Sequence, residues 1–238
     1  MPAAVRTSRT SRTSRTAGAT AGKLPLSQDR IVAAALELAD TRGDFSMRAL
    51  GEQLGVDPMA IYRHFPNKDA VLDALVDAAL ADLTPAPPEA ASPIERLRQL
   101  CVDFRLALGS HPGVAHRIRT TLPALGPHVI SLTEASLGLI IDVGVEPVEA
   151  PRVFALLIRF VTSTVEEEEQ VLADSGSEQA WREAVRQRYA SLSPGSFPKV
   201  AAMAAELGES SYQDEFEFGL DLLLDGIARR RSAPNVDA

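Results

Sequence analysis

The amino-acid sequence predicts an all-α protein, with a small N-terminal head of three helices that contains a helix-turn-helix and a larger helical domain behind it. Apolar residues recur at three- and four-residue spacing along most of the chain, and few segments alternate as a half-buried strand would. Only 5% of the 238 residues are aromatic. Residues that begin and end helices interrupt the apolar pattern. These observations together favour helices over strands.

The first two helices of the head have clear start and stop signals. Ser27 is a good N-cap, and the helix that it opens is expected over residues 28–42, where Gly43 stops it. Ser46 caps a second, short helix that Gly55 ends. Each helix is therefore bounded on both sides by residues that favour a helix end.

The next helices are marked by a proline and by an apolar stripe. Asp57 is an N-cap and Pro58 takes the first helical position, so a third helix of about two turns is expected before Pro66. A fourth, longer helix begins near Asn67, and its apolar stripe continues to Leu83. Further helices are expected over residues 93–109, 113–121, 127–143, 147–174, 178–192 and 210–231.

The second and third helices are joined by Gly55-Val56-Asp57, which is the layout of a helix-turn-helix. The glycine permits the tight turn, and Val56 fills the angle between the helices. In such a unit the second helix enters the major groove of DNA while the first lies across the backbone. Other helical hairpins share this spacing, so a purely structural hairpin is the alternative on spacing alone.

Composition excludes several classes of protein. The single cysteine, Cys101, cannot form an intramolecular disulfide, and no stretch approaches the ~20 apolar residues that a membrane helix needs. The first 23 residues contain no apolar core of the kind found in a secretory signal. We therefore expect a cytoplasmic protein with no membrane partner.

Charge is distributed unevenly along the chain, whose net charge is −8. Residues 1–70 contain ten Lys/Arg and seven Asp/Glu, whereas the remainder contains 14 and 25. This asymmetry indicates a head that can approach a polyanion and an acidic body that cannot. A protein that coats DNA without an effector would need a basic body, so the charge argues against an architectural DNA protein.

Residues 6–16 read RTSRTSRTSRT, a repeat of polar residues that cannot enter a core. We expect residues 1–24 to form a disordered arm ahead of a head at 25–70 and a body at 71–238. The arm is either a flexible leader or a means of reaching the minor groove with its arginines. The sequence leaves both alternatives open.

The residues of the helix-turn-helix carry a more specific signal. The run FSMRALGEQLGVDPMAIYRHFPNKDAVLDALVDAAL at 45–80 resembles the DNA-binding head of the tetracycline repressor family, and the matching elements include Leu54-Gly55-Val56, Ile61-Tyr62 and His64-Phe65. The segment at 216–227 resembles the last helix of the subgroup that contains the tetracycline repressor itself.

This resemblance extends over about 25–238 of the chain and implies a ligand-responsive transcriptional repressor. It assigns DNA binding to residues 25–70, and effector binding and dimerisation to residues 71–238. The implied partners are a palindromic operator in double-stranded DNA, a small organic effector that releases it, and a second copy of the chain.

The resemblance implies specific DNA contacts. Arg48 lies where the family places a base-reading side chain, because a guanidinium can bond guanine bidentately; a solvated arginine is the alternative. Tyr62, His64 and Lys68 match phosphate-binding positions, although His64 also fits a packing role. The start of the recognition helix offers only apolar contacts. The expected DNA-binding residues are Ser46, Arg48, Pro58, Met59, Ala60, Tyr62, Arg63, His64 and Lys68.

The last helix and segment 153–161 predict a homodimer. The last helix carries an apolar seam, and segment 153–161 is apolar almost all round, so both need cover. A four-helix bundle with a second copy would provide it, and its twofold axis would suit a palindrome. The alternative places both helices in the core of a monomer. The expected dimerisation residues are Phe154, Leu157, Val161, Phe216, Leu220, Leu223, Leu224 and Ile227.

The helices between residues 93 and 143 are expected to enclose the effector. By resemblance, His116 matches a histidine that holds Mg²⁺ beside tetracycline, and Glu167 an acidic residue from the partner. Thr84 and Leu100 replace side chains that hydrogen-bond the drug, so we expect a more apolar effector than tetracycline. No cofactor is expected, and Mg²⁺ bound with the effector is the less favoured alternative. The expected effector-binding residues are Leu97, Leu100, Phe104, Leu108, His116, Leu137 and Glu167.

Four consecutive carboxylates at 166–169 offer an alternative function, an all-α metal-dependent enzyme. A helix spreads four successive residues around its circumference, so at most one or two can face a pocket, and a solvated helix face is the simpler interpretation. A metal enzyme would need a second carboxylate motif with matching spacing, which the sequence lacks. We therefore expect a regulator and not an enzyme.

Overall fold

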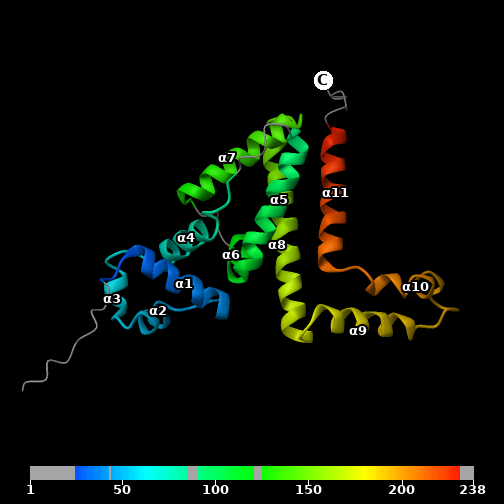
Figure 1. Cartoon of the computed structure of the whole chain (residues 1–238), viewed down its shortest axis with the longest axis horizontal. Helices are drawn as coiled ribbons and strands as arrows, with labels where there is room; N and C mark the ends of the chain where they lie inside the picture. The colour runs from blue at the N-terminus through cyan, green and yellow to red at the C-terminus, as the bar shows by residue number, and fades with distance from the viewer. Residues whose placement is uncertain (1–24, 43, 85–90, 121–124, 231–238) are drawn as a thin grey trace, which may run out of the picture.

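The computed structural model describes residues 25–42, 44–84, 91–120 and 125–230, and all regular structure in these ranges is helical. This confirms the predicted all-α class. The expected arm at 1–24 lies outside the described residues. The helices, drawn in Figure 1, are α1 Gln28–Arg42, α2 Met47–Leu54, α3 Pro58–Ile61, α4 Lys68–Ala79, α5 Pro93–Ser110, α6 Pro112–Thr120, α7 Pro127–Asp142, α8 Ala150–Ser175, α9 Glu178–Ala190, α10 Pro198–Ala202, the 3₁₀ helix η1 Glu206–Gly208, and α11 Tyr212–Arg230.

Helix α2 begins and ends at the residues that the sequence predicted. The Ser46 hydroxyl accepts a hydrogen bond from the Ala49 N–H at 3.1 Å and so caps α2. Gly55 ends α2 with φ at +65°, the left-handed conformation that glycine adopts without steric cost. A Cβ on Gly51 would lie 3.0 Å from the carbonyl oxygen of Val56, so glycine there lets α2 pack close to the turn.

The recognition helix is shorter than predicted. The α-helix α3 covers Pro58–Ile61 and continues as hydrogen-bonded turns, in which the His64 N–H bonds to Ile61 O at 2.9 Å. The prediction of two turns was wrong in its length, because the chain tightens before Pro66. Two short elements, α10 and η1, were not predicted at all. They are too short to show an apolar period.

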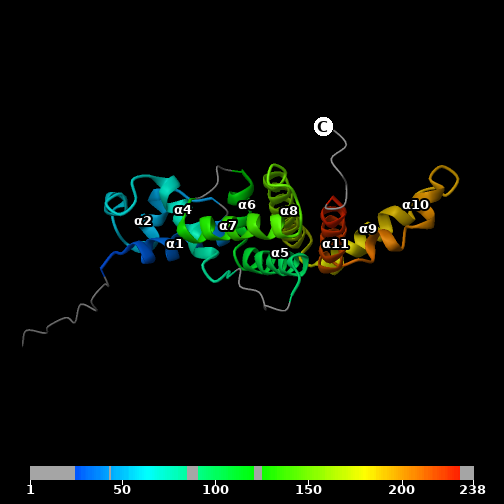
Figure 2. The ribbon, with the colours of Figure 1, turned by 90° about the horizontal axis from the view of Figure 1, so that it is seen from above.

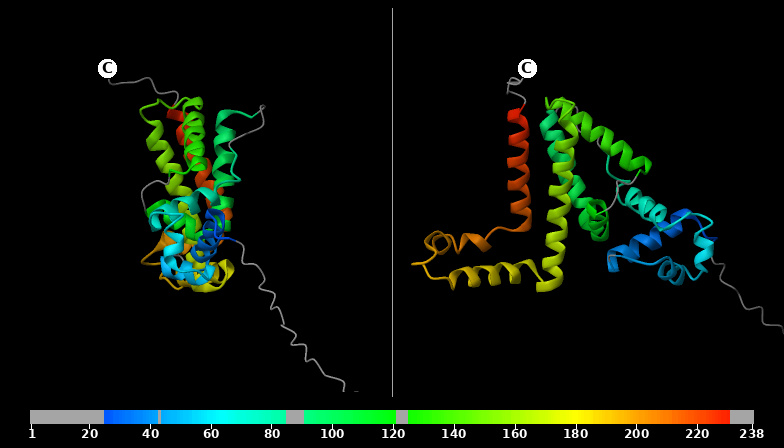
Figure 3. Two further views of the ribbon diagram at one scale, coloured as in Figure 1. Left: turned by 90° about the vertical axis from the view of Figure 1, so that its left-hand side faces the viewer. Right: turned by 180° about the vertical axis from the view of Figure 1, so that it is seen from behind.

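The body is a layer of helices with α8 at its centre. Helix α8 packs against α5, α6 and α7, and α11 lies along α5 and α8. The views in Figures 1 and 2 place the head at one end of the elongated molecule and α11 toward the other. Helix α9 leaves the lower end of α8 and projects away from the head, and α10 and η1 return beside α9, as the rear view in Figure 3 shows. No residue of α9 or α10 is buried.

Two close contacts join the head to the body. The N-terminus of α6 packs on α1 so tightly that a Cβ on Gly113 would lie 2.5 Å from the carbonyl oxygen of Ala39. Beside it, His111 Nδ1 lies 2.8 Å from Asp40 Oδ2. Helix α4 also contacts α6 and α7. The position of the head is therefore determined by α6 and α7 as well as by the chain connection. Among the described residues, no helix has the length and apolar character needed to cross a membrane.

Candidate DNA-binding head and ligand cavity

The exposed side of the helix-turn-helix presents the side chains expected to read DNA. The side chain of Arg48 is 85% exposed at the start of α2, and its Nε donates to Glu52 at 3.0 Å. Met59 on α3 is 66% exposed, and Tyr62 directly after α3 is 41% exposed. An ion pair on a solvated helix surface is weak, so DNA can draw Arg48 away from Glu52.

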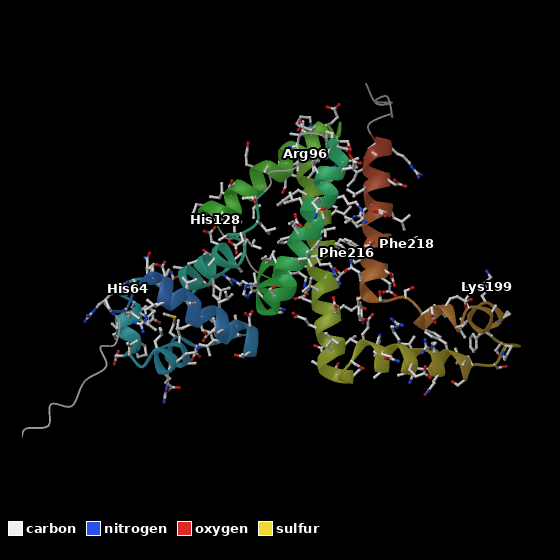
Figure 4. The ribbon with its side chains drawn as sticks, in the orientation of Figure 1. His64, Arg96, His128, Lys199, Phe216 and Phe218 are labelled. Atoms are coloured by element: carbon white, nitrogen blue, oxygen red, sulfur yellow. The ribbon has the colours of Figure 1, made fainter. Side chains whose placement is uncertain are left out.

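The remaining predicted contacts surround this surface. Ser46 uses its hydroxyl oxygen as the cap of α2, while Pro58 and Ala60 are half-buried in α3. Arg63 is exposed and His64 is half-buried at the tip of the head, where Figure 4 shows it. The structure thus brings the nine predicted residues to one end of the molecule.

Lys68 has a structural partner that the sequence did not reveal. Its ammonium donates to the Asp44 carboxylate and lies 5.4 Å from the centre of the Phe45 ring. The hydrogen bond from Lys68 holds the pKa of Asp44 below its ordinary value. Lys68 can still offer its charge to a phosphate, because a third of its side chain is exposed and its pair with the solvated Asp44 is weak.

A cavity of about 200 Å³ lies among α4, α5, α6, α7 and α8. Its wall is mostly apolar, which suits an organic ligand. Helix α4 contributes Val76 to it, and Leu80 and Leu83 follow from the turns at the end of that helix. Four further lining side chains carry a polar or thiol group: Cys101, Arg117, Thr133 and Ser136.

Three of the predicted effector residues line this cavity, and four do not. Leu97, Leu100 and Phe104 lie on the wall. Leu108 is fully buried beyond it, and Leu137 packs against the core from another face of α7. The periodicity of an amphipathic helix shows which side is apolar, but it does not show where along that side a cavity lies.

The prediction that His116 lines the effector site needs correction, whereas Glu167 was expected to act from a partner subunit and its role stays a prediction. The His116 side chain lies at the surface, 66% exposed, with Nδ1 2.9 Å from Glu166, and neither His116 nor Glu167 lies on the cavity wall. On α6 it is Ile118 and Arg117 that face the cavity. The described lining residues contain no histidine or carboxylate, so they do not fit the Mg²⁺ site that the resemblance implied. Nor does any cluster of three His, Cys, Asp or Glu elsewhere in the described ranges suit a metal ion.

The residues predicted on α8 for dimerisation line the cavity, a role that was not predicted for them. Phe154, Leu157 and Val161 all lie on its wall, together with Ile158. Sequence reasoning missed this role, as it missed the α7 residues Val129, Leu132 and Ile140. Segment 153–161 is apolar almost all round because one of its faces lines the cavity and another packs on a neighbouring helix. This apolar character was the sequence signal that could have indicated the cavity role.

The seam of α11 also packs inside its own chain. Phe216, Leu220, Leu224 and Ile227 are all at most 5% exposed, and Leu223 is half-buried. The Phe216 ring stacks on Phe160 of α8 with ring centres 5.6 Å apart, and the Arg105 guanidinium lies 4.8 Å from its centre. Figure 4 labels Phe216 and Phe218 on α11. Phe216, Leu220 and Leu224 therefore join α11 to α5 and α8 within one protomer, which corrects their predicted role as a dimer contact. Leu223 and Ile227 line a shallow hollow on the outer side of α8 and α11, so their role in dimerisation stays a prediction.

The acidic run at 166–169 is not the solvated face that was expected. Glu166 pairs with His116 and Arg119 of α6, and Glu168 accepts a hydrogen bond from Arg105 at 2.7 Å. Burial, together with the charges of Glu166, Asp40 and Glu168, raises the pKa of Glu169 to about 7. The run therefore ties α8 to α5 and α6 and places one carboxyl with a raised pKa near the head.

Two family models together match most of the chain. Residues 84–231 match a family model described as the tetracycline repressor-like C-terminal domain, and residues 31–75 match the model of the bacterial regulatory proteins of the tetR family. The chain belongs to the TetR family. The helix-turn-helix lies in the part of the chain that matches the N-terminal model, and most of the cavity wall lies in the part that matches the C-terminal model.

Several relatives of this TetR-family chain are named as repressors. The HTH-type transcriptional repressor DrrR1 of Streptomyces coeruleorubidus is 28% identical over 89% of this chain and 83% of its own. The class A tetracycline repressor from transposon 1721 of Escherichia coli is 30% identical over 87% and 92%. These relatives are regulators, which points away from the metal-dependent enzyme.

Solved structures show the same fold with ligands bound. The ActR protein of Streptomyces coelicolor, in complex with actinorhodin, matches with a TM-score of 0.77 and 27% identity over 88% of this chain and all of that one. A TetR variant from Acinetobacter baumannii, in complex with minocycline, matches with a TM-score of 0.70 and 30% identity over 89% and 98%. Ligand binding thus occurs in proteins of this fold with rather different small molecules.

Proposed function

We propose that this TetR-family chain is a ligand-responsive repressor that binds a palindromic operator as a homodimer and leaves it when a small organic effector binds. We expect it to act in the cytoplasm, where an operator lies. The observation that carries the proposal is the position of α4, which follows the recognition helix and brings Val76 and Leu80 to the cavity wall.

The effector is expected to be an aromatic or otherwise largely apolar molecule. The cavity wall offers many apolar side chains and few polar ones, so most of a bound molecule would be desolvated without forming hydrogen bonds. The complex of ActR with actinorhodin supports a small-molecule effector for a protein of this fold. Tetracycline with Mg²⁺ is not expected to release the DNA, because Leu100 and Ile118 line the wall and neither can bond a drug or a metal.

We propose the outer face of α8 and α11 as the contact with a second copy. Phe218 and Leu222, one helical turn apart on α11, are 68% and 58% exposed, and Leu156 of α8 is exposed near them. Leu156 and Leu222 line one shallow hollow, which Glu149 and Arg230 border with a 2.8 Å hydrogen bond. Apolar residues of this size on neighbouring helices favour burial against a partner.

Ligand-driven release follows from the same arrangement. A molecule that enters the cavity presses on the end of α4, and displacement there swings the recognition helix attached to its other end. In a dimer, both recognition helices would move together and lose their spacing on the palindrome. A coupling of about 1–3 kcal/mol is enough for a switch.

Selection of bound duplexes from a random DNA pool tests the proposal. We expect a palindromic consensus for the wild-type chain, and Arg48→Ala should relax one position in each half-site at a cost of about 1–3 kcal/mol. Arg229→Ala, which removes an exposed arginine on α11, is the matched control and should leave the consensus unchanged. Equal binding of the selected palindrome and scrambled DNA would contradict the proposal.

The same selected duplex tests the effector class. Tetracycline with Mg²⁺ should leave the complex intact, whereas apolar aromatic compounds should include molecules that dissociate it. Release by tetracycline at low concentration would overturn the expected ligand class while leaving the DNA-binding proposal in place.

A further inference from the structure

Arg117 lies between the cavity and the helix that carries the head. Its side chain lines the cavity and is only 19% exposed. Its Nη2 atom lies 3.7 Å from Asp69 Oδ1 and 3.7 Å from Asp73 Oδ1, both on α4. One guanidinium therefore faces the effector site and also holds two carboxylates of α4.

Among the described residues that line the cavity, Arg117 is the only charged one. The hydroxyls of Thr133 and Ser136 donate to the carbonyl oxygens of Val129 and Leu132 within their own helix. Burial raises the pKa of the Cys101 thiol to about 12, so that group stays neutral. The described part of the wall thus offers one cation and no anion.

One cation and no anion on the described part of the wall favour a ligand that carries a negative charge. A charged group that enters an apolar cavity loses its hydration and needs an opposite charge within hydrogen-bonding reach. A cationic ligand would find no carboxylate on the described wall, whereas an anionic one would find a guanidinium, which binds carboxylates through strong charge-assisted bonds.

We propose that the effector is an apolar, aromatic molecule with one anionic group, and that Arg117 binds this group in competition with Asp69 and Asp73. The proposal rests on the proposed function, since it names the chemical class of ligand for the same cavity. It also identifies Arg117 as the residue that transmits ligand binding to α4.

The geometry explains why this competition would act on the head. The two ion pairs are longer than a direct hydrogen bond, and Asp69 and Asp73 are largely and partly exposed, so the tie between α6 and α4 is weak. Asp69 lies in the first turn of α4, directly after the recognition helix. An anion that engages the guanidinium offsets its charge and weakens these two contacts at the start of α4.

A pair of probes with nearly the same size and shape, one anionic and one neutral, tests the proposal. Binding of 2-naphthoate and of its neutral analogue 2-naphthamide to the full-length chain is measured by titration calorimetry. We expect naphthoate to bind at least about tenfold more tightly, because only the carboxylate forms an ion pair with the guanidinium. Arg117→Met should abolish this preference, because naphthoate loses its ion pair and with it far more affinity than naphthamide.

Two further variants separate a ligand contact from a structural role. Arg119→Met, on the same helix but paired with Glu166, should keep the preference for naphthoate. The double variant Asp69→Asn with Asp73→Asn should bind naphthoate several-fold more tightly than the wild-type chain, because it removes two carboxylates that compete for Arg117. A defect in folding alone would not strengthen binding.

The outcomes also separate this proposal from the proposed function. Equal affinity for the two probes, or an unchanged preference in Arg117→Met, would overturn the role of Arg117 even if the chain binds its operator. Failure of both probes to bind would overturn the proposed class of aromatic anion. Failure to bind any selected operator would contradict the proposed function itself.

Discussion

Gly126 lies so close to Asp77 that a Cβ on residue 126 would overlap the Asp77 carboxylate. Gly126 is the N-cap of α7 and has no side chain to bond the first N–H groups of that helix. Asp77 on α4 supplies the missing acceptor, because its Oδ1 takes hydrogen bonds from the N–H groups of His128 at 2.9 Å and Val129 at 3.0 Å. The helix that carries the head thus caps a helix that lines the cavity.

A methyl group at position 126 should break this cap. We expect Gly126→Ala to destabilise the chain by about 1–3 kcal/mol, because the Asp77 carboxylate must move away and leave two partly buried N–H groups without their acceptor. Gly138→Ala on the same helix is the control: nothing lies within 4 Å of its added Cβ, so it should stabilise by about 0.4–1 kcal/mol. Denaturant unfolding measures both, and equal effects would contradict the capping role of Asp77.

Stability should depend on pH through Glu169, whose pKa is about 7 in the folded chain against an ordinary value of 4.5. Between these values the folded state holds a proton that the unfolded state has released, so the stability falls as pH rises. Because the carboxyl is partly solvated, we expect Glu169→Gln to raise Tm by about 2–4 °C at pH 8 and by much less at pH 5. Glu167→Gln, at an exposed position, should show no such difference between the two pH values.

Lys68 should contribute charge to DNA binding without reading sequence. We expect Lys68→Ala to weaken all duplexes similarly and to reduce the salt slope of binding by about one for each lost phosphate contact. Lys199→Ala, on α10 at the far end of the molecule in Figure 4, is the matched control. If both variants keep the wild-type salt slope, Lys68 makes no phosphate contact, and its ammonium contributes to the head only through Asp44 and Phe45.

The proposed dimer face can be broken without touching the core. We expect Phe218→Asp with Leu222→Asp to produce a monomer in sedimentation experiments, because two charges on that face cannot be buried unpaired. Leu106→Asp, at a similarly exposed position on α5, should remain dimeric. A double variant that keeps the wild-type mass in solution would place the dimer contact elsewhere.

The emission of Trp181, the single tryptophan, on the projecting helix α9, reports whether that helix contacts the partner.

The sequence predicted the head well, because its signals are local. Ser46 and Gly55 act through their own backbone neighbours, so their types alone locate the ends of α2. The cavity depends on helices far apart in the chain, and an apolar stripe looks the same whether it packs on α11 or faces a ligand. For this reason the sequence alone assigned Phe154, Leu157 and Phe216 to a dimer contact.

The charged contacts between helices could not be predicted from the sequence either. The pairing of Arg117 with Asp73 and that of Asp77 with the start of α7 join residues more than forty positions apart. No spacing rule relates such positions, so they could be found only from the packed structure.

Reciprocal linkage between the cavity and the head is the most direct test of ligand-controlled DNA release. The affinity for 2-naphthoate is measured on the free chain and on the chain saturated with its selected operator. If ligand binding and DNA binding favour different positions of α4, the operator-bound chain should bind naphthoate about 5–150-fold more weakly, and naphthoate should weaken operator binding by the same factor. Equal naphthoate affinity in the presence and absence of operator would contradict the claim that the cavity controls the head.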